Sequence, residues 1–174
     1  MSILETLKKK QKQLLVLAGQ EPVIVNEVYT ELFNETKRNE IEIKRFKIEK
    51  NSNFEQINAE AKNSSLFTQK SIYIISCSNL NFARDAKKMI IDLSKNSNGD
   101  VVVFHFEKDD VKTFKNSKFY NDISDHSYDI FALEPGAYEF KNMILKRAEH
   151  HALNIEEDAL SLFISLVDGN FSFA

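Results

Sequence analysis

The sequence contains one cysteine, two prolines, four glycines and no tryptophan. The single cysteine, Cys77, excludes an internal disulfide and cannot form a metal cage alone, and this usage fits a reducing cytoplasm. Four glycines are too few for the glycine-rich loops that bind nucleotides, and no G-x-G-x-x-G motif occurs. No stretch approaches the roughly 18 apolar residues needed to cross a bilayer. We therefore expect a soluble cytoplasmic protein with no membrane partner.

Neither basic nor acidic residues predominate, because 23 basic residues nearly balance 26 acidic residues and leave a formal net charge of -3. Such a chain has no global attraction to a phosphate backbone, so a nucleic-acid role would need a local patch or a partner's surface. The one cationic run is Lys8, Lys9, Lys10 and Lys12. We interpret it as a solvated face at the end of a first helix.

Apolar residues make up 43% of the 174 residues, enough for one ordinary domain and a small appendage. Five short apolar runs alternate with segments of helical period, which indicates strands joined by helical crossovers in a mainly parallel sheet. The runs cover residues 14–18, 41–48, 71–77, 101–106 and 128–133. The first and fourth runs are almost wholly apolar and should be central, whereas the second alternates with polar residues and should lie at an edge. The sequence thus predicts an α/β fold.

Several helix boundaries follow from local signals. Pro22 suits the first turn of the helix after the first strand, with Val25, Val28 and Leu32 facing the sheet. A capping box predicts a short helix over residues 53–62. The helix near residues 83–93 should bury its apolar stripe, and the carboxylates of residues 109 and 110 should cap a short helix that follows the fourth strand.

The pair Pro135 and Gly136 marks a domain boundary, because the alternation of strands and helices ends there. Two helices should follow, one over residues 138–152 and one opened by Asn154, whose side chain would cap it together with Glu157. The second helix carries one apolar stripe. Its members are Ala159, Leu162, Phe163 and Leu166.

The sequence offers no recognisable phosphate-binding, metal-binding or nucleophile motif. After the first strand, a phosphate-binding loop would need a second glycine, a lysine and a hydroxyl residue, but residues 19–24 offer none of these. Pro22 removes one amide, and Glu21 puts negative charge where phosphates would lie. The third strand ends without a carboxylate to hold a metal ion. We expect no catalysis, no cofactor and no metal, and we expect Cys77 to be an inert filler.

The histidines do not change this expectation. His105 should be a half-buried strand residue, and His126 should lie in a loop. His150 and His151 are neighbours on a helix and would point about 100° apart, which makes a poor metal site.

A distinctive feature remains, namely Ser65, Leu66 and Phe67 in a polar stretch just before the third strand. Three further features accompany it, namely a first strand that ends in Gly19 and is followed by Glu21, and the segments of residues 152–155 and 168–171. In this order, these features resemble the N-terminal part of the delta subunit of the bacterial DNA polymerase III clamp loader. The likeness extends over essentially the whole chain. Polar residues on both sides of Leu66 and Phe67 favour an exposed anchor over core residues at a helix end.

The resemblance implies a RecA-like AAA+ domain over residues 1–134, with a parallel sheet, helices on both faces and no functional ATP site. It implies the start of a small helical lid over residues 135–174, and a collar domain that this chain lacks. By the same resemblance, Leu66 and Phe67, flanked by Ser65 and Thr68, enter a pocket of the beta sliding clamp and open the ring for loading onto primed DNA in replication.

The remaining partners implied are the gamma/tau and delta-prime subunits, for the full-length protein, while primed DNA is reached only indirectly within the complex. The family is classed with the polymerase holoenzyme, a nucleotidyltransferase, although we expect no intrinsic catalysis. Two alternatives stay open. One is a degenerate P-loop-type nucleotide-binding enzyme, which nucleotide binding would reveal; the other is a scaffold for another protein.

Overall fold

The computed structural model describes residues 2–39, 41–49, 52, 59, 70–81, 84–95 and 100–167. The chain divides into two compact units, Met1–Ala132 and Leu133–Ala174, and each is described by itself. The helix predicted over residues 53–62 lies outside the described residues. Among the residues that are described, no helix has both the length and the apolar character needed to cross a membrane.

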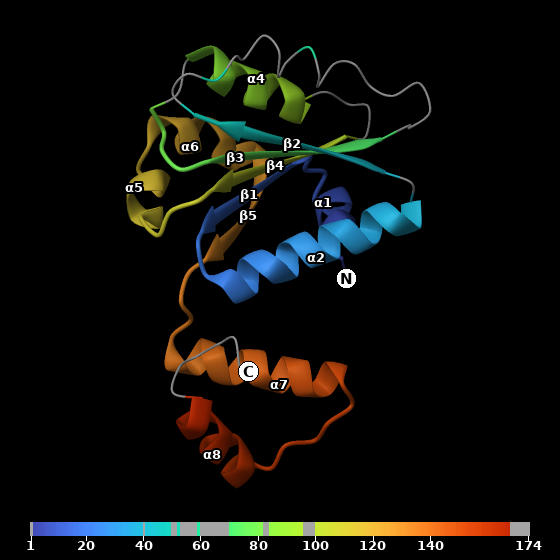
Figure 1. Ribbon diagram of the computed structural model, residues 1–174, viewed down its shortest axis with the longest axis vertical. Helices are drawn as coiled ribbons and strands as arrows, with labels where there is room; N and C mark the ends of the chain where they lie inside the picture. The colour runs from blue at the N-terminus through green and yellow to red at the C-terminus, as the bar shows by residue number, and fades with distance from the viewer. Residues whose placement is uncertain are drawn as a thin grey trace. The chain divides into compact units, whose positions relative to one another are not determined.

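The first unit is built on a five-stranded sheet in which every pairing is parallel, so the predicted α/β fold is confirmed. The spatial order is β2-β3-β4-β1-β5, which places β1 and β4 inside the sheet and β2 at an edge, as the sequence predicts. Figure 1 shows the twisted sheet with helices on both sides. The strands are β1 (Leu14–Gly19), β2 (Glu42–Ile48), β3 (Ser71–Cys77), β4 (Val101–Phe106) and β5 (Ser127–Ala132).

Two hydrophobic cores cover the two faces of the sheet, because side chains of a strand point alternately to opposite faces. Leu15 and Leu17 of β1 face one core with α1 and α2, while Leu14 and Val16 face the other core with α4, α5 and α6. All four are fully buried. The helices are α1 (Ile3–Lys9), α2 (Pro22–Asn39), α4 (Arg84–Lys95), α5 (Val111–Lys115) and α6 (Lys118–Ile123).

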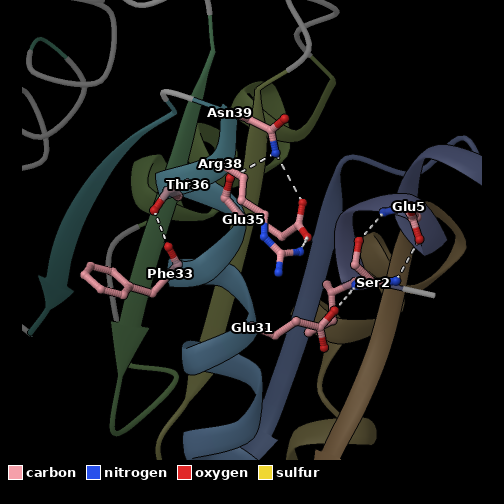
Figure 2. A network of polar contacts seen from close by, with 9 residues as sticks. Ser2, Glu5, Glu31, Phe33, Glu35, Thr36, Arg38 and Asn39 are labelled. Carbon is pink, nitrogen blue, oxygen red and sulfur yellow. Dashed lines mark hydrogen bonds and ion pairs between the residues drawn. The ribbon is translucent and has the colours of Figure 1, made fainter.

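The first two helices are tied together by polar contacts. Ser2 and Glu5 form a capping box at the start of α1, and the backbone N–H of Ile3 donates to the Glu31 carboxylate of α2. Figure 2 shows this junction and the contacts near the end of α2, where Thr36 donates to the Phe33 carbonyl over 2.7 Å. The capping box satisfies amides that a helix start leaves free.

The predicted helix starts in this unit are largely confirmed. Pro22 opens α2, and Val28 and Leu32 are buried against the sheet. The carboxylate of Asp110 accepts the N–H of Thr113 over 3.0 Å and caps α5. Met89, Ile90 and Leu93 of α4 are buried, as expected. Two elements were not predicted, namely α6, which Ser117 caps, and the 3-10 turn η1 (Ser124–His126) before β5.

The second unit contains α7 (Ala137–His150) and α8 (Glu157–Val167). The N–H of Gly136 donates to the Glu139 carboxylate over 2.7 Å at the start of α7. The prediction that Asn154 caps the next helix is wrong, because α8 begins three residues later, at Glu157, whose carboxylate instead pairs with Lys141 of α7.

The described part of α8 buries Leu160 and Val167. Two members of the predicted apolar stripe, Leu162 and Leu166, are 61% and 74% exposed.

Candidate functional site at the carboxyl edge of the sheet

The loop from β1 to α2 lies where parallel sheets of this class hold ligands, at the carboxyl ends of the strands. Gly19 ends β1 with φ of 122°, which L residues rarely adopt, and its register partner is Ala132 of β5. A Cβ at Gly19 would lie only 2.0 Å from the Ala132 carbonyl oxygen. That oxygen also accepts the N–H of Glu21 over 3.0 Å. Glycine is therefore required here by both the close approach and the backbone angle.

Three donors of this loop, the N–H groups of Glu21 and Val23 and the side-chain amide of Gln20, are bonded to groups of the protein itself. The Glu21 carboxylate accepts the N–H of Val23 over 3.3 Å, and Pro22 has no N–H to offer. The Gln20 amide donates to the carbonyl of Glu107 over 2.8 Å. An anion at a helix start is favourable because free amides and the helix dipole meet there. A side-chain carboxylate takes that place in this chain.

A hydrogen-bonded chain runs from α2 through β4 to the same loop. The Tyr29 hydroxyl lies 2.7 Å from Nδ1 of His105, and Nε2 of His105 lies 3.3 Å from the carbonyl oxygen of Gly19. A carbonyl only accepts, so Nε2 carries the hydrogen; in a neutral imidazole Nδ1 then accepts from Tyr29. The tautomer of His105 follows from these partners.

Burial governs the titration of both members of this chain. His105 is 5% exposed, which corrects the expectation that it would be half-buried. Burial lowers its pKa below 6.5, against the raising effects of the Gly19 carbonyl and of Glu107. Burial, with Glu107 as the second cause, raises the pKa of Tyr29 to about 12. Both groups are therefore neutral near pH 7, and the proton positions given above hold.

Glu107 follows β4 and lies beside the end of β3. Its Oε2 accepts from the Ser78 hydroxyl over 3.3 Å and lies 3.9 Å from Nζ of Lys47. Sequence reasoning passed over this carboxylate in favour of residues 109 and 110. Among the residues with assigned positions, no group of three or more His, Cys, Asp or Glu side chains could hold a metal ion. We assign Glu107 to polar contacts among strand ends.

Cys77 is buried at the end of β3. Burial raises the pKa of its thiol to about 12, with Glu107 as a second, smaller cause and a backbone N–H of Asn79 opposing them. The thiol is therefore protonated near neutral pH, and thiolate chemistry is suppressed.

The residues predicted to bind the clamp, Ser65, Leu66, Phe67 and Thr68, lie outside the described residues. Their role stays a prediction. The structure brings together Gly19, Gln20, Tyr29, His105 and Glu107, a group that sequence reasoning did not assemble. A signal was available, because a histidine inside an apolar strand needs a partner, and Tyr29 lies four residues after Val25 on the sheet-facing stripe of α2.

No protein-family model and no curated protein matches this chain. Among solved structures, it is similar to the Bacillus subtilis DNA clamp loader delta protein (YqeN), with a TM-score of 0.67 and 19% sequence identity. The likeness covers 97% of this chain and 52% of that protein, so this chain spans about half of that protein's length. At this level of identity the comparison bears on the fold, and this chain has a clamp-loader-like fold.

Proposed function

We propose that this chain works as a delta-type clamp-loader protein, which binds a sliding clamp without using nucleotide. The observation that carries the proposal is the β1–α2 loop. In a fold similar to that of a clamp loader delta protein, the Glu21 carboxylate accepts an amide at the helix start and Gln20 binds the Glu107 carbonyl. A nucleotide site needs free amides, a lysine and a bound metal ion at this place.

The clamp-binding anchor in this proposal is Leu66 with Phe67, flanked by Ser65 and Thr68. Two neighbouring apolar residues in a polar stretch have the composition of a hydrophobic plug for a pocket. Fully burying each is worth roughly 1.5–3 kcal/mol, so the pair supplies about 3–6 kcal/mol of binding free energy. Seating the plug would then bias the clamp toward an open ring.

The two units take different roles in this account. We assign the clamp-binding function to residues 1–134 as an AAA+-type domain without ATP chemistry. Residues 135–174 are assigned to a helical lid. Assembly with gamma/tau and delta-prime subunits, and delivery of the clamp to primed DNA, are proposals for the whole loader.

The test is an affinity measurement between this chain and its cognate clamp. The double variant Leu66→Ala with Phe67→Ala is expected to lose on the order of a hundredfold to ten-thousandfold in affinity, from the burial figures above. Its thermal unfolding should stay near that of the wild type. The matched control is Gln69→Ala, a neighbouring polar change that should cost little.

The melting temperature separates the two interpretations of this pair. If Leu66 and Phe67 were core residues, truncation of both would leave a cavity and lower the stability by several kcal/mol, and the protein would melt early with or without clamp. A variant with a near-native melt and unchanged clamp affinity would contradict the proposed anchor.

A further inference from the structure

Four lysines at the end of α1 and in the turn before β1 form a mainly exposed cationic surface, separate from the proposed clamp anchor. We call Lys8, Lys9, Lys10 and Lys12 the basic turn. The first two lie in the last turn of α1 and Lys10 is its C-cap. Gln11, with φ of 54°, then turns the chain toward β1. The side chains of Lys8, Lys9 and Lys10 are exposed, and Lys12 is half-buried.

Two of these ammonium groups are held by uncharged partners. Nζ of Lys10 lies 4.6 Å from the centre of the Tyr128 ring, and Nζ of Lys12 donates to the backbone carbonyl of Asp125. These contacts restrict the side chains without cancelling their charge. A bound anion therefore meets groups whose rotamer freedom is already reduced, which lowers the entropic cost of binding.

The carboxylates of the described residues leave the basic turn un-neutralised. The ion pairs found there involve Lys44, Lys47, Lys141 and Arg38, and none joins a carboxylate to the basic turn. Glu5, on the same helix, accepts the N–H of Ser2 instead. A helix C-terminus favours cations, which accounts for Lys8 and Lys9 in the last turn but not for Lys12 beyond it.

The two edges of the sheet differ in charge. The basic turn directly precedes β1 and so lies at the amino edge, and Figure 1 shows β1 running from the side of α1 to the start of α2. The loops at the carboxyl edge carry more acids than bases. Among the described residues of these loops in the first unit, the acids are Glu21, Glu49, Glu107, Asp109 and Asp110, against Lys108. The amino edge carries the acids Asp100 and Asp125, but they are outnumbered by the basic turn and Lys70. A polyanion would therefore be repelled by the carboxyl edge and attracted to the amino edge.

We propose that the basic turn binds the phosphate backbone of nucleic acid. Lysine ammonium groups bind phosphate as point charges and carry no base specificity, so the contact would serve for retention near a strand, not for recognition of a sequence. This goes beyond the proposed function, in which the chain reaches DNA only through its complex. It also rests on different residues from Leu66 and Phe67.

Binding is measured by fluorescence anisotropy with a labelled oligothymidine strand. If all four lysines contact phosphates of a single strand, log K should fall with log salt with a slope of about -3, or roughly 50-fold between about 50 and 200 mM salt. The variant Lys8→Gln with Lys9→Gln should lose about tenfold at the lower salt, with its slope reduced to about -1.5. Lys8→Arg with Lys9→Arg should retain binding.

The matched control is Lys112→Gln with Lys118→Gln, which removes the same charge from exposed lysines of α5 and α6. Its affinity should stay within about twofold of the wild type, because the effect expected is local. Absence of binding by the wild type up to about 100 µM at the lower salt, the weak end of non-specific binding, would overturn the proposal. An equal loss in the control pair would also overturn it.

Measuring clamp binding and oligothymidine binding on the same variants distinguishes the nucleic-acid proposal from the clamp-binding proposal. Leu66→Ala with Phe67→Ala should lose clamp and keep oligothymidine, whereas Lys8→Gln with Lys9→Gln should do the reverse. If the lysine variant loses clamp instead of oligothymidine, the basic turn is a protein contact and the nucleic-acid proposal is wrong.

Discussion

The Tyr29 hydroxyl donates to Nδ1 of His105 over 2.7 Å and so ties α2 to β4 beside the β1–α2 loop. The rings meet edge to face, with centroids 5.7 Å apart. On its other side the same imidazole donates to the carbonyl of Gly19. Side chains of the protein thus fix the shape of the β1–α2 loop.

Removal of the Tyr29 hydroxyl should destabilise the protein. Tyr29→Phe leaves Nδ1 of the buried His105 without its donor, which costs about 1–3 kcal/mol in the free energy of unfolding. Urea denaturation measures this. Tyr138→Phe is the matched control, because that tyrosine is 77% exposed and its hydroxyl should contribute little. Equal midpoints for the two variants would show that the Tyr29 bond contributes nothing.

Gly19→Ala should be among the most damaging single changes. The new Cβ would lie 2.0 Å from the Ala132 carbonyl oxygen at a backbone angle that alanine rarely adopts. We expect a loss on the order of 3 kcal/mol or more, seen as a large fall in melting temperature. Gly136→Ala is the control, because its Cβ would lie 3.1 Å from the Glu139 side chain, which can move. A near-native melt for Gly19→Ala would contradict the loop geometry.

Stability should fall as the pH drops below about 6.5. Burial lowers the pKa of His105 in the folded protein, so the unfolded chain takes up a proton in a pH range where the folded chain does not. The stabilisation is therefore complete above the unfolded pKa of about 6.5 and is lost as the pH falls toward the folded value. The slope from this one group is at most about 1.4 kcal/mol per pH unit.

Urea midpoints between about pH 7.5 and 5.5 test this, a range in which histidine is the side chain that ordinarily titrates. His105→Gln should be less stable throughout, with a flatter pH dependence. Identical slopes in the variant and the wild type would assign the effect to another group.

Stability should also fall as the pH rises above about 9. The thiol of Cys77 ordinarily titrates at 9.0, but burial raises its pKa to about 12, so the unfolded chain releases a proton first. Its contribution is present below pH 9 and is lost as the pH rises toward 12. Cys77→Ala should lower the alkaline slope by up to about one proton, measured between about pH 8.5 and 9.5. Tyr29, Tyr73 and Tyr120, whose pKa values burial also raises, contribute equally to both proteins. An unchanged slope would contradict the burial of this thiol.

The periodicity of the sequence predicts the sheet well because strands covered on both faces must be apolar. Residues 14–18 and 101–106 show this in interior strands, and the alternation over residues 41–48 shows it for an edge strand. The sequence does not predict α6, because its two buried apolar residues, Phe119 and Ile123, are too few to show a helical period. Short helices are set by packing more than by local preference.

The site was harder to predict, because its geometry depends on contacts far apart in sequence. The pairing of Tyr29 with His105 needs the position of α2 over β4, and the requirement for glycine at residue 19 comes from the Ala132 carbonyl of β5. The capping of α8 by Asn154 failed for a related reason. Asn154 is a good capping residue by type, but residues 154–156 are irregular and the helix starts only at Glu157.

The most direct test of the account is the affinity of this chain for its cognate clamp, measured by calorimetry without nucleotide and again with Mg-ATP. Because Glu21 and Gln20 already fill the loop with internal bonds, the account predicts the same affinity in both buffers and no change in melting temperature with Mg-ATP. Binding that appears or tightens only with Mg-ATP would contradict it. So would an upward shift of the melting temperature with Mg-ATP alone.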